Sequence, residues 1–277
     1  MTKEPWRLIL DPIPARGAWN MATDEAILDA CSRGDSLPTL RLYAWEPACL
    51  SLGYAQPFGD VDIISLQMHG WELVRRPTGG KAVLHTDELT YSVITRADEP
   101  RLAGTILESY NRLAQALVEA LRLINLPVEM KEHKDTIEGN TNPVCFEVPS
   151  IYEITVGGKK LIGSAQARRK EGVLQHGSLP LRGDLTRILQ VLTFPDEKTR
   201  QHAAERLLAH ATTVEAALGS VLSWETVAQA FVNAFGSVLN MELQPADLSP
   251  GEKSRARELV EEKYAHPDWT QNHKKYV

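Results

Sequence analysis

Several features that define other protein classes are missing from this 277-residue chain. No run of 18 apolar residues occurs, and the first residues, M-T-K-E-P-W, lack the apolar stretch of a signal peptide. The three cysteines, Cys31, Cys49 and Cys145, are widely spaced without a C-x-x-C pair, which argues against a disulfide framework and a zinc site. We therefore expect a cytoplasmic protein that neither spans a membrane nor holds a metal.

The chain also lacks the basic surface of a general nucleic-acid-binding protein, because its formal net charge is -6. The local exception is the stretch G-G-K-K-L-I-G-S-A-Q-A-R-R-K over residues 157 to 170, which contains no acidic residue. Hydrophobic residues make up 43% of the sequence, enough for a full core. We expect an enzyme-like domain with neither nucleic acid nor a membrane as partner.

The spacing of apolar residues predicts a mixed α and β domain. Short strand-like runs alternate with helices through the first half, and the clearest helix extends from Thr105, which forms a capping box with Glu108. We predict an α+β fold in one catalytic domain over residues 1–277. It comprises a mixed β-sheet core over about 1–182 with flanking helices, and a mostly helical segment over about 183–277 packed on that core.

A hairpin is predicted in the later part of this core. Gly157 and Gly158 form its two-residue turn, which places Thr155 opposite Lys160. Lys160 then points away from the apolar layer of the hairpin. That layer contains Ile154, Val156 and Leu161.

The most informative stretch spans residues 71 to 85 and reads W-E-L-V-R-R-P-T-G-G-K-A-V-L-H. Two short apolar runs flank a turn in which Gly79 and Gly80 permit positive φ and a close approach of a ligand to the backbone. An anionic or strongly polar ligand suits such a turn, and an ordinary hairpin with solvated charges is the alternative. A Walker loop is excluded because Ala82 stands where that motif needs Ser or Thr. The cations beside the turn are Arg75, Arg76 and Lys81.

Cys145 is the candidate nucleophile among the cysteines. It lies in N-P-V-C-F-E-V-P-S at the exit of a polar loop, where a thiol can be exposed near the cation-rich hairpin. A free thiol with a pKa of about 8.5 is only a few per cent thiolate at neutral pH, so a nearby cation such as Lys160 would matter. Cys31, in a helix, and Cys49, in a strand, are interpreted as buried residues.

Small residues follow Lys160 along its strand. Gly163, Ser164 and Ala165 leave room for a substrate beside the lysine, and a plain surface lysine is the alternative interpretation.

Two histidines and two acidic residues are weaker candidates. His176 is interpreted as structural, and His85 as either structural or a proton carrier. Asp24 and Glu25 would form a paired acid site, although solvated charges on a helix are more common.

Four motifs occur in a fixed order after an opening N-M-A-T-D-E-A at residues 20–26. They are R-R-P-T-G-G-K-A-V-L-H, C-F-E-V-P-S, G-K-K-L-I-G-S-A-Q-A-R-R and L-Q-H-G-S-L. Together they resemble the lipoate-protein ligase and octanoyltransferase family, most closely its ligase-like octanoyltransferases. The resemblance covers nearly the whole chain, to the late K-Y-A-H-P-D-W. It implies the catalytic fold of biotin and lipoate protein ligases.

The resemblance also implies roles for single residues. Cys145 matches the acyl-accepting cysteine of the transferases, and Lys160 matches the active-site lysine. The arginine and glycine turn with His85 matches the wall of the acyl pocket. With the small residues after Lys160, the expected substrate-binding residues are Arg75, Arg76, Gly79, Gly80, His85, Gly163, Ser164 and Ala165.

An octanoyltransferase of lipoate biosynthesis is the function that this resemblance implies. Octanoyl-acyl carrier protein would be the donor, and a lipoyl domain or glycine-cleavage H-type protein the acceptor. No cofactor is expected, because the donor thioester already carries the activation. The cations Lys159, Arg168, Arg169 and Lys170 are expected to dock the acidic carrier protein.

Three alternatives remain open at this point. An ATP-dependent lipoate-protein ligase would use an acyl-adenylate instead of a cysteine thioester. An octanoyl amidotransferase between lipoyl proteins would use the same cysteine chemistry. A non-catalytic acyl-binding protein on the same fold is the third.

Overall fold

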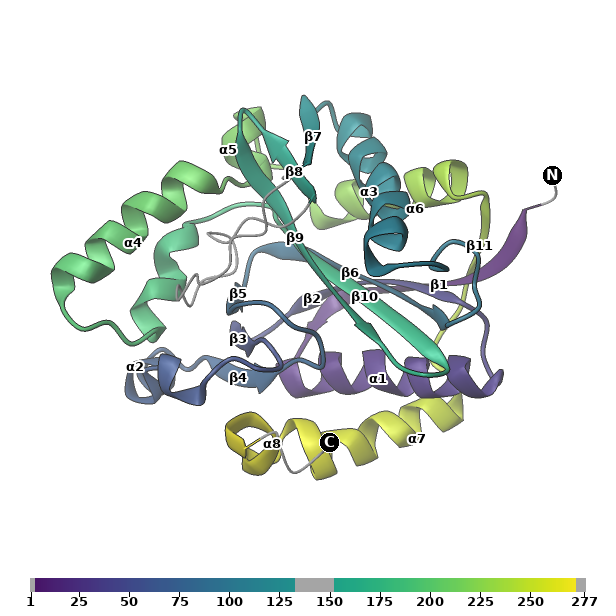
Figure 1. Ribbon diagram of the computed structural model, residues 1–277, viewed down its shortest axis with the longest axis horizontal. Coiled ribbons are helices and arrows are strands. Elements are labelled where there is room, and N and C mark those ends of the chain that lie inside the picture. Colours follow the sequence, from purple (N-terminus) through teal and green to yellow (C-terminus); the bar gives the residue numbers. More distant parts are fainter. Residues whose placement is uncertain (1–2, 133–151, 273–277) are drawn as a thin grey trace.

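The computed structural model describes residues 3–132 and 152–272 (Figure 1). An eight-stranded sheet with the strand order β11-β1-β2-β6-β10-β9-β8-β7 forms its centre. β1 runs parallel to β2 and β11, and the pairs from β2–β6 onward are antiparallel, so the sheet is mixed as predicted. Its strands are β1 (Glu4–Ala15), β2 (Thr39–Trp45), β6 (Glu88–Arg96), β7 (Val128–Glu132), β8 (Tyr152–Val156), β9 (Lys159–Arg168), β10 (Gly172–Pro180) and β11 (Met241–Pro245).

Helices cover both faces of this sheet (Figure 1). α3 (Ile106–Leu123) and α6 (Trp224–Val238) lie on one face and enclose the largest apolar cluster. α1 (Gly17–Arg33) lies on the other face, and α7 (Pro250–Leu259) packs against α1. The predicted capping box is present at the start of α3, where the Thr105 hydroxyl accepts from Glu108 N–H.

β6 explains how the two faces differ. Leu89, Tyr91 and Val93 belong to the apolar cluster under α3 and α6, and the alternate residues Thr90 and Ser92 point to the opposite face. All residues from 88 to 95 are buried. The polar face of β6 is therefore enclosed by protein, and its side chains must find partners there.

A second sheet of three strands has the order β4-β3-β5. Its strands are β3 (Cys49–Leu52), β4 (Glu72–Arg75) and β5 (Val83–His85). β3 lies between the other two, parallel to β4 and antiparallel to β5. The interpretation of residues 71 to 85 as an ordinary hairpin is therefore wrong, because the glycine segment crosses over β3 instead of joining paired neighbours.

The hairpin between β8 and β9 confirms the predicted register. Gly157 and Gly158 have φ values of 56° and 78°, and Thr155 pairs with Lys160. An irregularity follows, because Ile154 pairs with Ile162 and leaves one extra residue in β9. Leu161 and Ile162 consequently both enter the core under α3 and α6, and Lys160 lies on the other face.

The segment after residue 183 is mostly helical, as predicted, but β11 is a strand that completes the large sheet beside β1. Its helices also close the back of the small sheet, where Trp269 Nε1 donates to the Arg75 carbonyl at 2.8 Å. The remaining short and long helices are η1 (Phe58–Asp60), α2 (Ile63–Met68), η3 (Leu185–Val191), α4 (Glu197–His210), α5 (Val214–Leu218), η4 (Val260–Tyr264) and α8 (Pro267–Asn272). None of the helices in the described ranges is long and apolar enough to cross a membrane.

Candidate functional site

A cavity of about 460 Å³, including its open mouth, lies between the two sheets. β9 and β10 of the large sheet contribute residues 163–165 and 176–178, and β2 contributes Tyr43 and Trp45. Ser51, Val83 and His85 face them from the small sheet, and Gly80 from the glycine turn. The surface that the lining exposes to the cavity is mostly apolar, because polar side chains such as His85 and His176 are engaged with protein partners, and such a surface is typical of a small-molecule site.

Arg76 holds the glycine turn in place. Its guanidinium donates to the carbonyl oxygens of Gly79 and Lys81 at 2.8 Å each, and to the Ser51 carbonyl at 3.0 Å. Gly80 has a φ of 95°, and its carbonyl lies so close to Gly53 that a Cβ there would be 1.9 Å away. Gly80 is therefore needed for its positive φ, and Gly53 is needed because a Cβ would collide with the Gly80 carbonyl.

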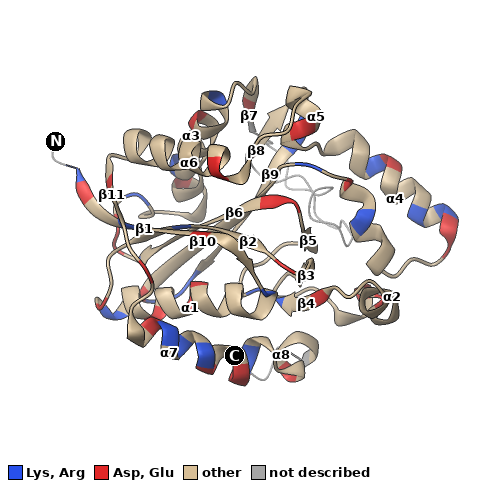
Figure 2. Ribbon diagram, turned by 180° about the vertical axis from the view of Figure 1, so that it is seen from behind, with Lys and Arg blue, Asp and Glu red and all other residues tan. Residues whose placement is uncertain are grey.

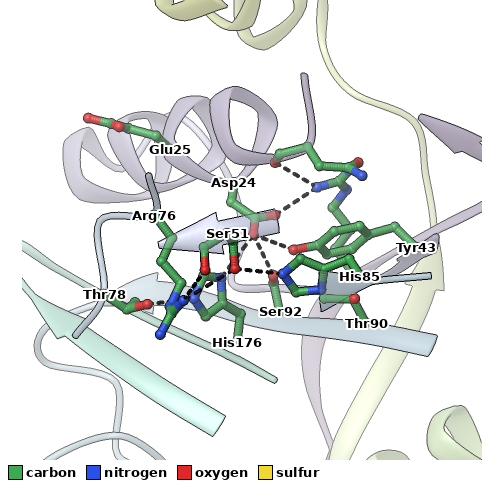
Figure 3. Close-up of polar contacts among 12 residues, drawn as sticks. Asp24, Glu25, Tyr43, Ser51, Arg76, Thr78, His85, Thr90, Ser92 and His176 are labelled. Carbon is green, nitrogen blue, oxygen red and sulfur yellow. Dashed lines mark hydrogen bonds and ion pairs between the residues drawn. The ribbon is translucent and has the colours of Figure 1, made fainter. Parts of the chain in front are cut away.

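His85 forms a hydrogen-bonded chain with Ser51, shown in Figure 3, and with Glu88. Its Nε2 lies 2.8 Å from the Ser51 hydroxyl, and its Nδ1 lies 2.7 Å from Glu88 Oε1. The ring stacks on Trp45 with centroids 4.0 Å apart. Arg76 also donates to the Ser51 hydroxyl at 3.2 Å. Because both ring nitrogens are engaged, His85 contributes a fixed wall to the cavity.

His176 and Asp24 form a second chain on the opposite side of the cavity (Figure 3). His176 Nδ1 lies 3.6 Å from Asp24 Oδ2, and Nε2 lies 2.7 Å from the Thr78 hydroxyl. Asp24 accepts from Arg41 at 2.8 Å and from the Ser92 hydroxyl at 2.6 Å. All of these groups are buried, so the chain is shielded from water.

The charge states in this second chain follow from its surroundings. Burial would raise the pKa of Asp24, but the hydrogen bond from His176 and the charge of Arg41 hold it below the ordinary value. Burial lowers the pKa of His176, and the neighbouring Asp24 only partly opposes that shift. Near neutral pH the pair is therefore an ionised carboxylate beside a neutral imidazole.

Lys160 lies on the same face of β9 as Gly163 and Ala165, which line the cavity. It is 5% exposed, and its ammonium lies 3.4 Å from Glu153 Oε1. The alternative interpretation as a plain surface lysine is wrong, because the hairpin face opposite the apolar layer is also buried. A buried lysine paired with a carboxylate can supply a fixed positive charge beside a ligand.

The structure brings together most of the expected substrate-binding residues. Gly80, Arg76, His85, Gly163 and Ala165 line the cavity. Ser164 lines it as well, but its hydroxyl points to the other face of the sheet and lies 2.7 Å from the Tyr91 hydroxyl. Gly79 belongs to the adjacent, exposed part of the turn.

Arg75 does not fit the expected role. Its side chain is completely buried and donates to the carbonyl oxygens of Gly53, Gln56 and Thr270, at 2.8, 2.7 and 2.7 Å. These bonds join the small sheet to α8. Arg75 is therefore a structural residue, and its charge is directed away from the cavity.

The four expected docking cations do not form one surface. Lys159 begins β9 and Arg168 ends it, so about 30 Å separates them at roughly 3.3 Å per residue. Arg168 donates to Leu102 O and the Ser109 hydroxyl, and Arg169 pairs with Glu25 and Asp29. Of the three cations at that end, Lys170 alone is highly exposed, at 94%. Elsewhere basic and acidic residues are interspersed (Figure 2).

Cys31 and Cys49 are buried, as interpreted from the sequence. Burial raises the pKa of Cys31 to about 12 and that of Cys49 well above its ordinary value. Neither thiol is therefore suited to act as a thiolate nucleophile. Cys145 lies outside the described residues.

Sequence reasoning missed Ser51, Thr78, Glu88 and Glu153, and it treated Asp24 as a weak candidate. Asp24 and Glu25 are both buried, but they serve different neighbours: Asp24 faces His176, and Glu25 binds Lys263 at 2.8 Å. A usable signal was the alternation of polar and apolar residues in E-L-T-Y-S-V, residues 88 to 93. It marks a strand with one polar face, but it does not reveal that this face is enclosed.

Comparisons with known proteins agree with this arrangement. The family model described as the lipoyl protein ligase A/B catalytic domain matches residues 16–236. The octanoyltransferase LipM of Moorella thermoacetica is 44% identical over 271 residues, 97% of this chain and 98% of that protein. The octanoyltransferase LipM of Kyrpidia tusciae is 39% identical over 271 residues, 96% of this chain and 98% of that protein.

Solved structures that match this fold include lipoate-protein ligases. A bipartite lipoate protein ligase from Thermoplasma acidophilum has a TM-score of 0.79 and 26% identity, with 98% of this chain and 97% of that chain covered. A lipoate-protein ligase A bound with ATP has a TM-score of 0.77 and 26% identity, with 98% and 99% covered. With its mixed sheet, flanking helices and matched catalytic region, this chain belongs to the lipoyl protein ligase A/B catalytic-domain family.

Proposed function

We propose that this chain is an octanoyltransferase of lipoate biosynthesis that moves an octanoyl group from acyl carrier protein to a lysine of a lipoyl-accepting protein. The observation that carries the proposal is the mostly apolar cavity between the sheets, with Lys160 on the cavity face of β9. Full-length similarity to octanoyltransferases supports octanoyl as the acyl group. The activity is that of an acyltransferase.

The first half of the proposed reaction forms a thioester on the enzyme. The Cys145 thiolate attacks the carbonyl carbon of the donor thioester, and the carrier thiolate leaves and takes a proton. The octanoyl-Cys145 enzyme remains. Exclusion of Cys31 and Cys49 by their burial and raised pKa values supports Cys145 as the nucleophile.

Two sources of positive potential face the developing oxyanion in this proposal. One is the ammonium of Lys160, and the other is the backbone of the glycine turn. The described residues offer no hydrogen-bond partner to the N–H groups of Gly79 and Gly80. Donors that are already in place stabilise an oxyanion without reorganisation, which lowers the barrier to acyl transfer.

The second half of the proposed reaction is aminolysis. The neutral amine of the acceptor lysine attacks the octanoyl-Cys145 carbonyl, the C–S bond breaks as the amide forms, the amine proton is released to solvent, and the cysteine thiolate is regenerated. A lipoyl domain or a glycine-cleavage H-type protein is the proposed acceptor. Because donor and acceptor act in turn, the scheme predicts ping-pong kinetics.

A transfer assay without nucleotide tests this proposal. Octanoyl-acyl carrier protein and a lipoyl domain are mixed with the enzyme and a magnesium chelator, and the acceptor is analysed by intact mass. We expect octanoylated acceptor from the wild type and none from Cys145→Ala. Formation of product by Cys145→Ala at the wild-type rate would show that the cysteine route is wrong.

An ATP-dependent ligase is the second candidate, since a solved structure of the same fold is a lipoate-protein ligase A bound with ATP. That activity would attach free lipoate or octanoate only when ATP and magnesium are present, and it would survive Cys145→Ala. An amidotransferase would instead accept an octanoylated lipoyl protein as donor. The donor requirement in the same assay separates the three activities.

A further inference from the structure

Thr78 connects the glycine turn to the eight-stranded sheet. Its hydroxyl lies 2.7 Å from His176 Nε2, and the two residues are 1% and 7% exposed. Thr78 lies in the crossover between β4 and β5, whereas His176 lies in β10. The hydrogen bond therefore spans the two sheets at the edge of the cavity.

Asp24 sets the direction of this hydrogen bond. Its carboxylate is ionised and lies 3.6 Å from His176 Nδ1. A negative oxygen beside Nδ1 favours the tautomer with the proton on Nδ1, which leaves Nε2 as an acceptor. The Thr78 hydroxyl then donates to Nε2, and the chain runs from Asp24 through His176 to Thr78.

The turn is fixed on its protein side by its carbonyl groups as well. The Thr78 carbonyl accepts from Tyr54 N–H at 2.8 Å, and the Gly79 carbonyl accepts from Arg76 at 2.8 Å. The N–H groups of Gly79 and Gly80 have no partner in the described part of the chain. The local hydrogen bonds thus hold the backbone and leave those donors available to a ligand.

We propose that Asp24, His176 and Thr78 form a positioning chain that holds the N–H groups of Gly79 and Gly80 at the oxyanion of acyl transfer. The inference rests on the proposed function. His176 acts through Thr78 and not as a proton carrier, because its Nε2 is occupied by the threonine hydroxyl. The positioning chain thus fixes the glycine turn relative to the eight-stranded sheet, which carries Lys160.

The matched variants Thr78→Val and Thr78→Ser test the hydroxyl. Valine keeps the shape of the side chain without the hydroxyl, and serine keeps the hydroxyl. The rate of octanoylation of Cys145 should fall on the order of 10- to 100-fold in Thr78→Val, because small displacements of catalytic donors have effects of that size. Thr78→Ser should stay within about threefold of the wild type.

Saturation kinetics and hydrogen exchange separate positioning from a general structural role. The loss in Thr78→Val should lie in the maximal acylation rate, with the donor concentration for half-maximal rate within about threefold of the wild type, because the turn amides meet an oxyanion only in the transition state. Amide exchange of Tyr54, whose N–H donates to the Thr78 carbonyl at 2.8 Å, should be faster in Thr78→Val than in Thr78→Ser. Thr95→Val is the matched control, because it removes another buried hydroxyl, one without a partner and outside the cavity lining.

Three results would overturn the positioning chain: wild-type acylation by Thr78→Val, equal losses in both Thr78 variants, or a loss that matches the drop in folded fraction. Absence of octanoyl-Cys145 in the wild type would instead reject the proposed function, and hydrogen exchange would still test the chain. Asp24→Asn is unsuitable as a test, because it would also remove the buried one of the two carboxylates that pair with buried Arg41.

Discussion

The two faces of the eight-stranded sheet are buried to a similar degree but differ in chemistry. Under α3 and α6, Leu113, Leu117 and Leu121 meet Phe231 and Phe235 in an apolar cluster. On the face toward α1 and the small sheet, carboxylates, imidazoles and hydroxyls form two hydrogen-bonded chains around a cavity. The first face gains stability from area removed from water, and the second must satisfy every polar group that it encloses.

The contrast is not complete, and the exception is informative. Tyr91 points under α3 and α6, and its hydroxyl lies 2.7 Å from Ser164 and accepts from Gln175 at 3.0 Å. The Tyr91 hydroxyl is thus satisfied within the apolar face by two neutral partners. Asp24 and His176, whose pKa values are both perturbed, lie on the cavity face, where a reaction can use them.

Removal of the Lys160 side chain should produce the largest change in activity, because this ammonium is one of the groups proposed to stabilise the oxyanion. We expect Lys160→Ala to lower the rate of octanoyl transfer on the order of 10²- to 10³-fold, the range for loss of one oxyanion donor. Stability should also fall, by about 1–3 kcal/mol, since Glu153, whose side chain is 13% exposed, loses a partner. The sequence predicted that Lys160 points away from the apolar layer of the hairpin, but it did not show that this second face is buried as well.

Single-turnover kinetics and urea unfolding on the same preparation measure both quantities. If Lys160→Ala transfers octanoyl at the wild-type rate per folded molecule, Lys160 takes no part in the reaction. The functional contrast between the two faces of the sheet would then be weaker.

Truncation of a side chain on the apolar face should lower stability and leave the rate of transfer per folded molecule unchanged. Leu117 is completely buried in the cluster under α3 and α6. Leu117→Ala should lower the free energy of unfolding by about 2–5 kcal/mol and leave transfer per folded molecule unchanged. Denaturant titration with parallel rate measurements checks this; a selective loss of activity would show that the two faces are not independent.

Glu25 lies on α1, the helix on the cavity face of the large sheet, but it does not line the cavity. It therefore tests how a buried charge on this face contributes to stability. Burial would raise its pKa, but Lys263 and Arg169 hold the pKa below its ordinary value. A lowered folded pKa means that the stabilisation is present above the unfolded pKa of about 4.5 and is lost as pH falls through the folded value. Glu25→Gln should therefore be less stable than the wild type by about 1–3 kcal/mol at pH 7.

The difference between wild type and Glu25→Gln should shrink as the pH falls below 4.5, the ordinary pKa of glutamate. Urea unfolding at pH 7 and at lower pH measures it. A difference that stays constant with pH would mean that the charge of Glu25 does not contribute.

Lys170 should give the smallest effect. Its side chain is 94% exposed. Lys170→Glu should change stability by less than about 0.5 kcal/mol and leave the KM for the carrier-bound donor within about twofold. A large rise in KM that disappears at high salt would restore a docking role for this end of β9.

Much of the fold was predictable because local signals and tertiary structure agree. The capping box of α3, the Gly157–Gly158 turn and the pairing of Thr155 with Lys160 all follow from short-range patterns, and each is confirmed. The extra residue at Leu161 left no signal of its own, because a bulge depends on how both strands pack. The strand β11 was missed within a segment dominated by helices.

The site was less predictable because its groups meet across the two sheets. Residues 163–165 and His85 were found through small-residue and motif patterns, and they line the cavity. The partners of His176, by contrast, come from α1 and from the crossover before β5, and no spacing in the sequence links them. Arg75 and Arg76 are adjacent in sequence, yet only Arg76 faces the cavity, since neighbours on a strand point in opposite directions.

Intact mass of the protein after mixing with octanoyl-acyl carrier protein tests the central claim most directly. The account predicts that the wild type gains one octanoyl group without nucleotide, that peptide mapping places it on Cys145, and that a lipoyl domain removes it. A protein that gains no octanoyl group, or gains it on Cys31 or Cys49, would contradict the account.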